Sequence, residues 1–371
     1  MKRTDDEFET RDGVHLARTV WAPAHRDGGR SNSGDGDGGP RGGVLLIHGM
    51  AEHRKRYAAL AETLAGRGFL VWAYDHRGHG DTAVGPESRR HIAPGNNWTA
   101  LVEDARELLS ALARVVAEAA AGAEADGGGE GLGAGNDAGT APRPAPPPRA
   151  AAPPRTPGPL FALGHSMGSL VLRDALRDPP SPLCGAILMG TAGSGGLKAM
   201  VGRALAASVA AFKAPAAPSR LLNDLTFGPY NAAIADAQTE FDWLSRDTDE
   251  VRRYIEDPHC GEVMSAHFYR ELARGIMRVS SRAAIEAIPH ETSLLLMSGT
   301  EDPVGGPSGR GVREVAGRLE RAGHPHVELR LRAGARHELL HELDRNEVIG
   351  EIADWLDDQA STCQKRPHPQ E

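Results

Sequence analysis

The chain has 371 residues, of which 40% are hydrophobic and 25% charged, with a formal net charge of −8. This length allows two average domains, or one large α/β domain with an insertion. Phosphate binding needs lysine and arginine clustered on one face, and no such cluster stands out in this acidic sequence. Composition and charge therefore argue against a nucleic-acid-binding protein.

The first residues, MKRTDDEFETRDG, lack the apolar run of an export signal, and no membrane span appears in the sequence. We therefore expect a cytoplasmic protein. The three cysteines, Cys184, Cys260 and Cys363, are odd in number and have no C-x-x-C spacing. We expect neither a disulfide framework nor a zinc ribbon from them.

Strand and helix patterns alternate along most of the chain. Short apolar runs predict strands at 44–47, 69–74, 160–163, 184–190, 294–299 and 327–332. Amphipathic patterns predict helices at 57–66, 98–119, 167–176, 311–322 and 344–358, the second capped by Asn97. Fully apolar strands that alternate with amphipathic helices predict a mostly parallel sheet covered on both faces.

Two tracts differ from this pattern in composition. Residues 26–43 and 121–158 are nearly all Gly, Pro, Ala and small polar residues, too poor in apolar side chains to offset the entropy of ordering them. We expect both tracts to be disordered loops, and 359–371 to be a disordered tail. The glycine-rich second tract leads into a proline-rich spacer, so it does not predict a phosphate-binding turn.

Residues 191–289 interrupt the alternation with helical and loop-like sequence that lacks a clear buried strand. We interpret them as an inserted helical lid between a first core part at 1–190 and a second at 290–358. Their aromatic residues, as in FDWLSRDTDEVRRYIEDPHCG, suit internal packing, and the same residue types suit the wall of an apolar binding site.

The motif GHSMG, residues 164–168, follows one predicted strand and precedes a predicted helix. A strand, a sharp turn and a helix raise a serine hydroxyl above the edge of a sheet. Gly164 and Gly168 suit such a turn, because a strained and tightly packed backbone leaves no room for side chains there. The pattern predicts that Ser166 is a nucleophile.

A serine nucleophile needs a base and a group that orients the base. In a doubly wound sheet these partners lie in loops after later strands, the acid before the histidine. Asp302 and Glu301 follow the strand at 294–299, and His337 follows the strand at 327–332. We favour Asp302 as the acid because Pro303 fixes the turn after it.

An oxyanion hole requires two donors directed at the developing negative charge. One candidate is the backbone N–H of Met167, directly after the nucleophile at a helix start. The other is the N–H of Met50, in the loop HGMAEH after the strand at 44–47.

The stretch HELLH, residues 337–341, also fits the zinc-protease pattern H-E-x-x-H. Such motifs lie inside a continuous helix, whereas His337 follows a strand and the residues AGAR. A third ligand is also missing, so we interpret His337 as the base, and Glu338 and His341 as residues on a helix face. The segment DHRGHG, residues 75–80, is interpreted as a structural turn and not as a metal site.

The motifs HGMAEH, DHRGHG, GHSMGS, SGTEDPVG and GARHE, in this order, resemble the α/β-hydrolase superfamily. More narrowly, they resemble its monoacylglycerol lipase and lysophospholipase group, which is also classed with serine aminopeptidases. The resemblance covers about residues 8–358 apart from the two low-complexity tracts. It implies an α/β-hydrolase fold, the triad Ser166, Asp302 and His337, and oxyanion donors at Met50 and Met167. Met50 departs from the small residue usual in the family.

We therefore expect a serine hydrolase that cleaves carboxylic esters, such as monoacylglycerols or lysophospholipids, without a cofactor or metal. Its partner would be a small acyl ester, with a transient contact between lid and membrane surface. An aminopeptidase is the alternative within enzymes, and it would hold a substrate ammonium with acidic lid residues. The candidates are Glu240, Asp242, Asp247, Asp249 and Glu250. A non-catalytic binding protein on the same scaffold is the other alternative.

Overall fold

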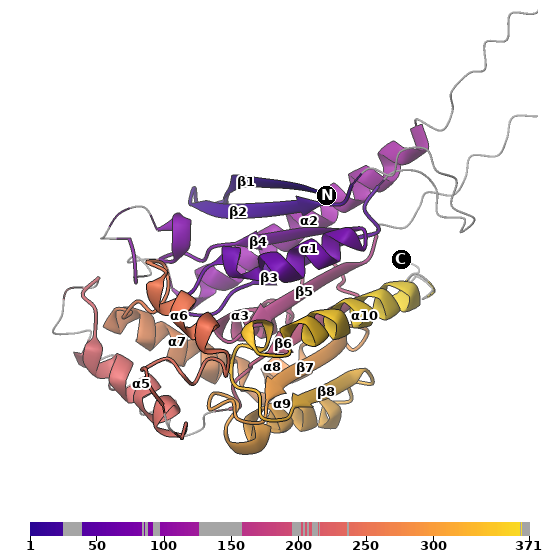
Figure 1. The fold of residues 1–371 in the computed structure, drawn as a ribbon. Helices are drawn as coiled ribbons and strands as arrows, with labels where there is room; N and C mark the ends of the chain where they lie inside the picture. Colours follow the sequence, from indigo (N-terminus) through magenta and orange to yellow (C-terminus); the bar gives the residue numbers. More distant parts are fainter. Residues whose placement is uncertain are drawn as a thin grey trace, which may run out of the picture.

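The computed structural model describes residues 1–24, 39–83, 88–91, 97–125, 158–194, 216–235 and 237–363, with a few single positions beside them. Eight strands form one sheet in the order β1-β2-β4-β3-β5-β6-β7-β8 (Figure 1). All neighbours from β4 to β8 pair in parallel, and β1 and β2 are antiparallel to theirs. The strands are β1 (Lys2–Glu9), β2 (His15–Ala22), β3 (Gly42–Ile47), β4 (Phe69–Tyr74), β5 (Leu160–His165), β6 (Gly185–Met189), β7 (Ser293–Gly299) and β8 (Val327–Arg332).

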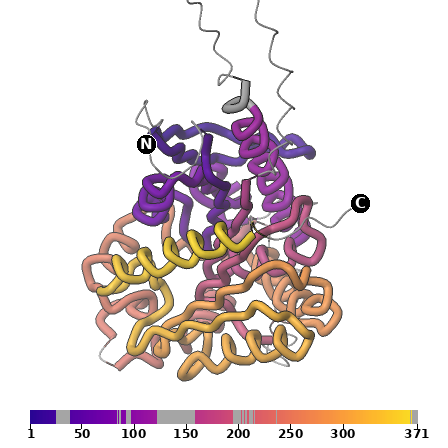
Figure 2. Tube along the Cα trace, turned by 90° about the vertical axis from the view of Figure 1, so that its right-hand side faces the viewer, coloured from indigo at the N-terminus to yellow at the C-terminus, as the bar shows by residue number. Residues whose placement is uncertain are grey.

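Helices cover both faces of the sheet, and the strands supply side chains to each face alternately. In β3, Val44 and Leu46 contribute to one buried cluster, whereas Leu45 and Ile47 contribute to the other. Helices α1 (Ala58–Gly66) and α10 (Arg345–Cys363) cover the first face, and they lie side by side (Figure 2). The opposite face is covered by α2 (Trp98–Ala125), α3 (Met167–Ala175) and α9 (Arg310–Arg321). These layers confirm the predicted parallel sheet with helices on both sides.

Between β6 and β7 the chain leaves the sheet, and its described residues there include the helices α5 (Arg220–Ala232), α6 (Thr248–Glu256), α7 (Ala266–Val279) and α8 (Arg282–Glu286). We call the described residues from 216 to 289 the lid. In Figure 1, α5 and α6 lie together at one end of the sheet. Ser265 and Asp247 accept hydrogen bonds from the first backbone N–H groups of α7 and α6, so side-chain caps fix where both helices begin. Of the helices that the structure describes, none is long and apolar enough to cross a membrane.

The hairpin of β1 and β2 was not predicted. β1 is almost entirely exposed and consists largely of charged residues, so it lacks the apolar run by which the other strands were recognised. Asp12-Gly13, with Gly13 at φ 79°, lies in the turn between the two strands. This dipeptide, followed in β2 by residues that alternate between buried and half-buried, was the available hairpin signal.

The ends of both low-complexity tracts are ordered, contrary to the prediction. Gly42 and Gly43 begin β3, where a Cβ on Gly42 would lie 2.6 Å from the carbonyl oxygen of Pro159. These glycines are therefore required by close packing between strands and do not mark disorder. Helix α2 continues to Ala125, whereas 26–38 of the first tract and 126–157 of the second lie outside the described residues.

The carboxyl end of the chain also differs from the prediction. Helix α10 continues through Cys363, beyond the predicted end at 358, and Cys363 forms a disulfide with Cys184. The two cysteines are 179 residues apart, so no local spacing could indicate their pairing. The expectation that the cysteines form no disulfide was wrong for this pair. Cys260 is free and buried.

Candidate active site

Ser166 occupies the turn between β5 and α3. Its backbone has φ 49° and ψ −118°, outside the regions that residues with a side chain ordinarily adopt. The flanking glycines make this turn possible, because a Cβ on Gly164 would lie 2.4 Å from the carbonyl oxygen of Gly168. A Cβ on Gly168 would lie 2.2 Å from the carbonyl oxygen of Ile47 in β3. The local packing therefore holds a partly exposed serine above the edge of the sheet.

Asp302 and His337 meet in the loops that follow β7 and β8. Nδ1 of His337 donates to Oδ1 of Asp302 at 3.0 Å, and both side chains are buried. The loops approach closely at Gly299, where a Cβ would lie 1.9 Å from the carbonyl oxygen of Ala335. Glu301, the residue before Asp302, is exposed. The structure thus places Asp302, and not Glu301, against the imidazole.

Asp302 is held in its ionised form. Burial opposes the charge, but the neighbouring His337, the hydroxyl of Ser298 at 2.9 Å and the N–H of Val304 at 2.9 Å outweigh it and lower the pKa of the carboxyl. An ionised carboxylate only accepts hydrogen bonds, so the proton on Nδ1 of His337 is fixed and Nε2 is left as the basic nitrogen.

One cavity of about 300 Å³ brings the predicted residues together. Ser166, His337, Met50 and Met167 all line it, and Asp302 lies behind the imidazole. The floor is the carboxyl edge of the sheet, and the lid forms the opposite wall. Apolar side chains on this wall include Phe227, Tyr230, Phe241, Trp243, Leu272 and Ile276.

The lid also contacts the loop that carries His337 directly. The ring of Trp243 lies 5.1 Å from that of His337, and the backbone N–H of Glu338 donates to the carbonyl of Leu244 at 2.8 Å. The side chain of Arg336 donates to the carbonyls of Asp242 at 2.6 Å and Ser245 at 2.9 Å. The FDWLS segment therefore fixes the position of His337, a role that its sequence did not indicate.

A buried polar network beneath the site was not predicted. Glu52 accepts hydrogen bonds from His165 at 2.9 Å, from Tyr57 at 3.0 Å and from the N–H of Gly49 at 2.6 Å. Arg56 joins Glu52 to Glu338 through charged hydrogen bonds of 2.9, 2.6 and 2.7 Å. Burial alone would raise the pKa of Glu52, but His165 and Arg56 together hold it well below its ordinary value. The network fixes the HGMAEH loop beside Ser166.

The interpretation of Glu338 as a helix-face residue was wrong. The stretch HELLH forms a loop and one short 3-10 turn, Leu339–His341, so Glu338 points inward to Arg56. Nδ1 of His337 faces Asp302, while Nδ1 of His341 faces Glu250 at 3.4 Å. The two histidines do not share a helix face as the zinc-protease motif requires.

The segment DHRGHG forms a buried turn. Asp75 accepts hydrogen bonds from Arg54 and from the N–H of Asp81, and Arg77 pairs with Asp104. A Cβ on Gly80 would lie 2.2 Å from the Asp75 carboxylate. These contacts account for its charged residues within the fold.

The five acidic lid residues named as candidates from the sequence do not gather at the cavity. Of the five candidates, Glu240 alone lines it. Asp242 accepts hydrogen bonds from its own turn and Asp247 caps α6. Asp249 and Glu250 pair with arginines of the same helix.

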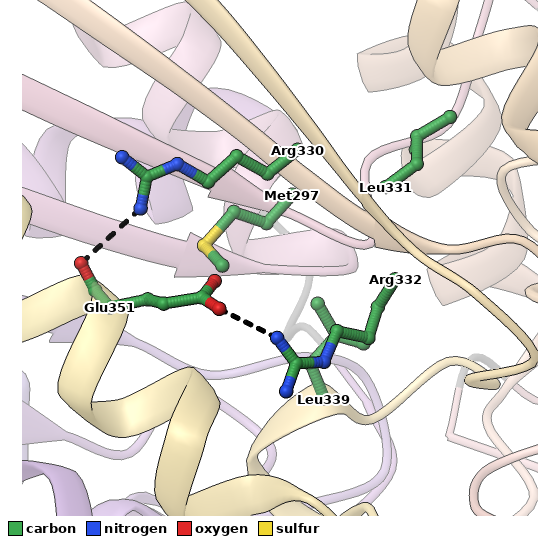
Figure 3. Close-up of a pocket in the computed structure, with 6 residues that line it drawn as sticks. All are labelled: Met297, Arg330, Leu331, Arg332, Leu339 and Glu351. Atoms are coloured by element: carbon green, nitrogen blue, oxygen red, sulfur yellow. Dashed lines mark hydrogen bonds and ion pairs between the residues drawn. The ribbon is translucent and has the colours of Figure 1, made fainter.

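A second hollow, of about 500 Å³, lies beside β8 and α10 and is lined by Met297, Arg330, Leu331, Arg332, Leu339 and Glu351 (Figure 3). Arg332 donates to the Glu351 carboxylate at 2.6 Å, and Arg330 donates to the Glu351 carbonyl at 3.4 Å. Among the described residues that line this hollow there is no serine, cysteine or histidine, so they offer no counterpart of Ser166 and His337.

Comparisons with known proteins agree with this geometry. The sequence matches the family model of serine aminopeptidases (S33) over residues 38–122 and 149–344. A monoacylglycerol lipase of Mycolicibacterium smegmatis is 26% identical, over 95% of this chain and 97% of that protein. Human monoglyceride lipase is 24% identical, over 95% and 90% of the respective chains. A thermostable carboxyl esterase from Bacillus coagulans superposes with a TM-score of 0.75 at 23% identity, covering 97% of this chain and 99% of that one.

The parallel sheet, the serine elbow and the helical lid define an α/β-hydrolase. Within that class the chain belongs to the serine aminopeptidase (S33) family. This confirms the resemblance drawn from the five ordered motifs.

Proposed function

We propose that this chain hydrolyses monoacylglycerol-like esters with Ser166 as nucleophile, His337 as general base and Asp302 as the orienting acid. The chain is a carboxylic ester hydrolase, in line with relatives named monoacylglycerol lipases. The observation that carries the assignment of roles is the 3.0 Å contact between His337 and Asp302 at a cavity that Ser166 also lines.

In the proposed reaction, Nε2 of His337 removes the Ser166 proton as the oxygen attacks the ester carbonyl. The carbonyl oxygen becomes negative and is stabilised by the N–H groups of Met50 and Met167, each worth about 3 kcal/mol in the transition state. His337 then protonates the leaving alcohol, and an acyl-enzyme remains on Ser166. Water attacks this ester with His337 again as the base, and both serine and acid are released.

The polar lining of the cavity supports a neutral head group. Among the described residues that line the cavity, Arg220 is the one lysine or arginine, whereas Asp224, Glu240 and Glu262 carry negative charge. This charge balance disfavours a phosphate, because the carboxylates repel it. We therefore favour a monoacylglycerol over a lysophospholipid. The apolar lid wall suits one acyl chain.

Both alternatives have weaker support. An aminopeptidase would hold an ammonium with carboxylates such as Asp224, Glu240 and Glu262, which line the cavity. The relatives that match nearly the whole chain are named monoacylglycerol or monoglyceride lipases, and this favours an ester. A non-catalytic binding protein would have no need of a strained serine and an oriented imidazole at the same cavity.

The test is labelling by a fluorophosphonate probe together with hydrolysis of p-nitrophenyl esters, monoacylglycerol, lysophospholipid and aminoacyl amides. Ser166→Ala should abolish labelling and lower kcat by roughly 10⁴-fold or more. Asp302→Asn should lower kcat by about 10⁴-fold, because the proton of the His337 imidazole is then no longer held on Nδ1. The matched Glu301→Gln should leave kcat unchanged. Labelling that survives Ser166→Ala would overturn the assignment of Ser166 as the nucleophile. Faster cleavage of amides than of esters would favour the aminopeptidase.

A further inference from the structure

A group of three metal-binding side chains lies beside the cavity, separate from the residues of the proposed triad. It consists of His53, Asp257 and Cys260, each of which offers a ligand atom within 4.8 Å of the other two. His53 belongs to the HGMAEH loop of the core, whereas Asp257 and Cys260 belong to the turn after α6 in the lid. The group therefore bridges the core and the lid.

We propose that these residues bind one zinc-class cation, and that the bound cation inhibits the enzyme. An imidazole, a thiolate and a carboxylate form a ligand set of nitrogen, sulfur and oxygen that suits Zn²⁺ or Cd²⁺. Mg²⁺ and Ca²⁺ prefer oxygen ligands and are disfavoured here. Three protein ligands leave a fourth position of a tetrahedral zinc ion for water.

The distances require only small movements. Nε2 of His53 lies 2.9 Å from Oδ2 of Asp257, and two such ligands of tetrahedral zinc stand about 3.3 Å apart. A sulfur and a nitrogen ligand stand about 3.6 Å apart, so Cys260 must approach from within the observed 4.8 Å. The Cys260 side chain has to turn toward His53, and the Asp257 carboxylate can rotate to adjust its own distance because that side chain is 31% exposed. The same exposure gives the ion a path from solvent.

The turn after α6 that carries Cys260 is hydrogen-bonded to the HGMAEH loop, which carries the Met50 amide. The N–H of Gly261 donates to the carbonyl of Ala51 at 3.0 Å, and the hydroxyl of Tyr254 donates to the same oxygen at 2.8 Å. Ala51 has φ 57° and directly follows Met50. Cys260 itself lines the cavity. A cation that draws Cys260 toward His53 would thus shift the loop that carries the Met50 amide and restrict lid movement.

Binding is tested on the purified full chain in thiol-free buffer by titration with Cd²⁺, which gives an ultraviolet charge-transfer band only when a thiolate binds it. One equivalent of Cd²⁺ should produce the band, and Zn²⁺ should displace Cd²⁺ and remove it. Cys260→Ala should abolish the band. His53→Gln should weaken binding at least about 10-fold. Cys184→Ser with Cys363→Ser is the matched control, and it should retain the full band because Cys260 is still present.

Thermal unfolding of each variant establishes that it is folded, and Cys260→Ser replaces Cys260→Ala if the latter is not. Absence of the band at stoichiometric Cd²⁺ would overturn the site. An unchanged affinity in His53→Gln would also overturn it, since Cd²⁺ would then be held by the thiol alone.

Inhibition is tested separately, as the ratio of p-nitrophenyl acetate hydrolysis with and without Zn²⁺ in each variant. The ratio should fall in the wild type and stay near one in Cys260→Ala, and an equal fall in both would refute the inhibitory role. The binding experiment needs no catalytic activity, so it remains decisive if the proposed ester hydrolysis fails.

Discussion

Glu52 and His165 form a buried acid–base pair, and His165 directly precedes Ser166. Burial alone would lower the pKa of His165, but its hydrogen bond to Glu52 and the charge of that carboxylate raise it. A raised pKa means that the folded state binds the proton more tightly than the unfolded chain does. The pair therefore stabilises the fold fully below pH 6.5, the ordinary pKa of histidine, and less as the pH rises through the raised value.

The variant His165→Asn should remove this pH dependence. We expect the free energy of unfolding of the wild type, minus that of the variant, to decrease between pH 6 and pH 9. The measurement is urea unfolding at several pH values. Subtracting the free energy of unfolding of the variant from that of the wild type cancels the contributions of buried histidines such as His48 and His76. Their pKa values are lowered mainly by burial, so their contributions change with pH in the opposite direction. The exposed His15→Asn is the control and should give a flat difference, whereas a flat or rising difference for His165→Asn would refute the prediction.

Helix α5 has one face in the cavity and another in solvent. Phe227 and Tyr230 line the cavity, while Leu221 and Leu225, one turn apart, are 55% and 54% exposed. Two exposed leucines at this spacing form an apolar patch on the lid. We propose that this patch makes the transient membrane contact through which a lipid ester reaches the cavity.

The double variant Leu221→Gln with Leu225→Gln should lower hydrolysis of monoacylglycerol in phospholipid vesicles by about 10-fold or more, because each buried leucine contributes about 1.5–3 kcal/mol. Hydrolysis of water-soluble p-nitrophenyl acetate should be unchanged, since neither leucine lines the cavity. Glutamine is used because it keeps helix propensity high. Leu343→Gln is the matched control, as Leu343 is 62% exposed but lies outside the lid. An equal loss on both substrates would contradict the membrane role.

The fully buried strands and the strand-end positions of Ser166, Asp302 and His337 were predictable, because apolar runs mark such strands and loop order follows from a parallel sheet. Elements whose side chains face solvent were harder to recognise, as β1 shows. The contact between Arg56 and Glu338 was not predictable, because it depends on how two segments 282 residues apart pack together. The same reason applies to Trp243 beside His337.

At the scale of the whole molecule, the Cys184–Cys363 disulfide attaches the end of α10 to the residue before β6. Helix α10 covers one face of the sheet, and the disulfide holds the last residue of this helix against the sheet. Disulfides persist mainly in oxidising compartments and are rare in the cytosol, so this disulfide argues against the predicted cytoplasmic location.

Reduction of this disulfide should lower the free energy of unfolding by about 2–4 kcal/mol, because the released chain gains conformational entropy when unfolded. Guanidinium unfolding with and without reductant measures the change. The double variant Cys184→Ser with Cys363→Ser should be destabilised to a similar extent and should not respond to reductant. Sensitivity of that variant to reductant would show that another thiol is responsible.

The two long tracts of small residues interrupt the chain at the amino ends of strands. β3 begins at Gly42 and β5 at Leu160, whereas Ser166 follows the carboxyl end of β5. Helix α2 likewise ends away from α5 and α6 (Figure 1). The described residues at the two ends of the second tract, Ala125 and Gly158, thus lie on the side remote from the cavity that Ser166 lines. An affinity handle or fluorophore inserted between them would be joined to the protein through that side, which leaves the lid free for a substrate.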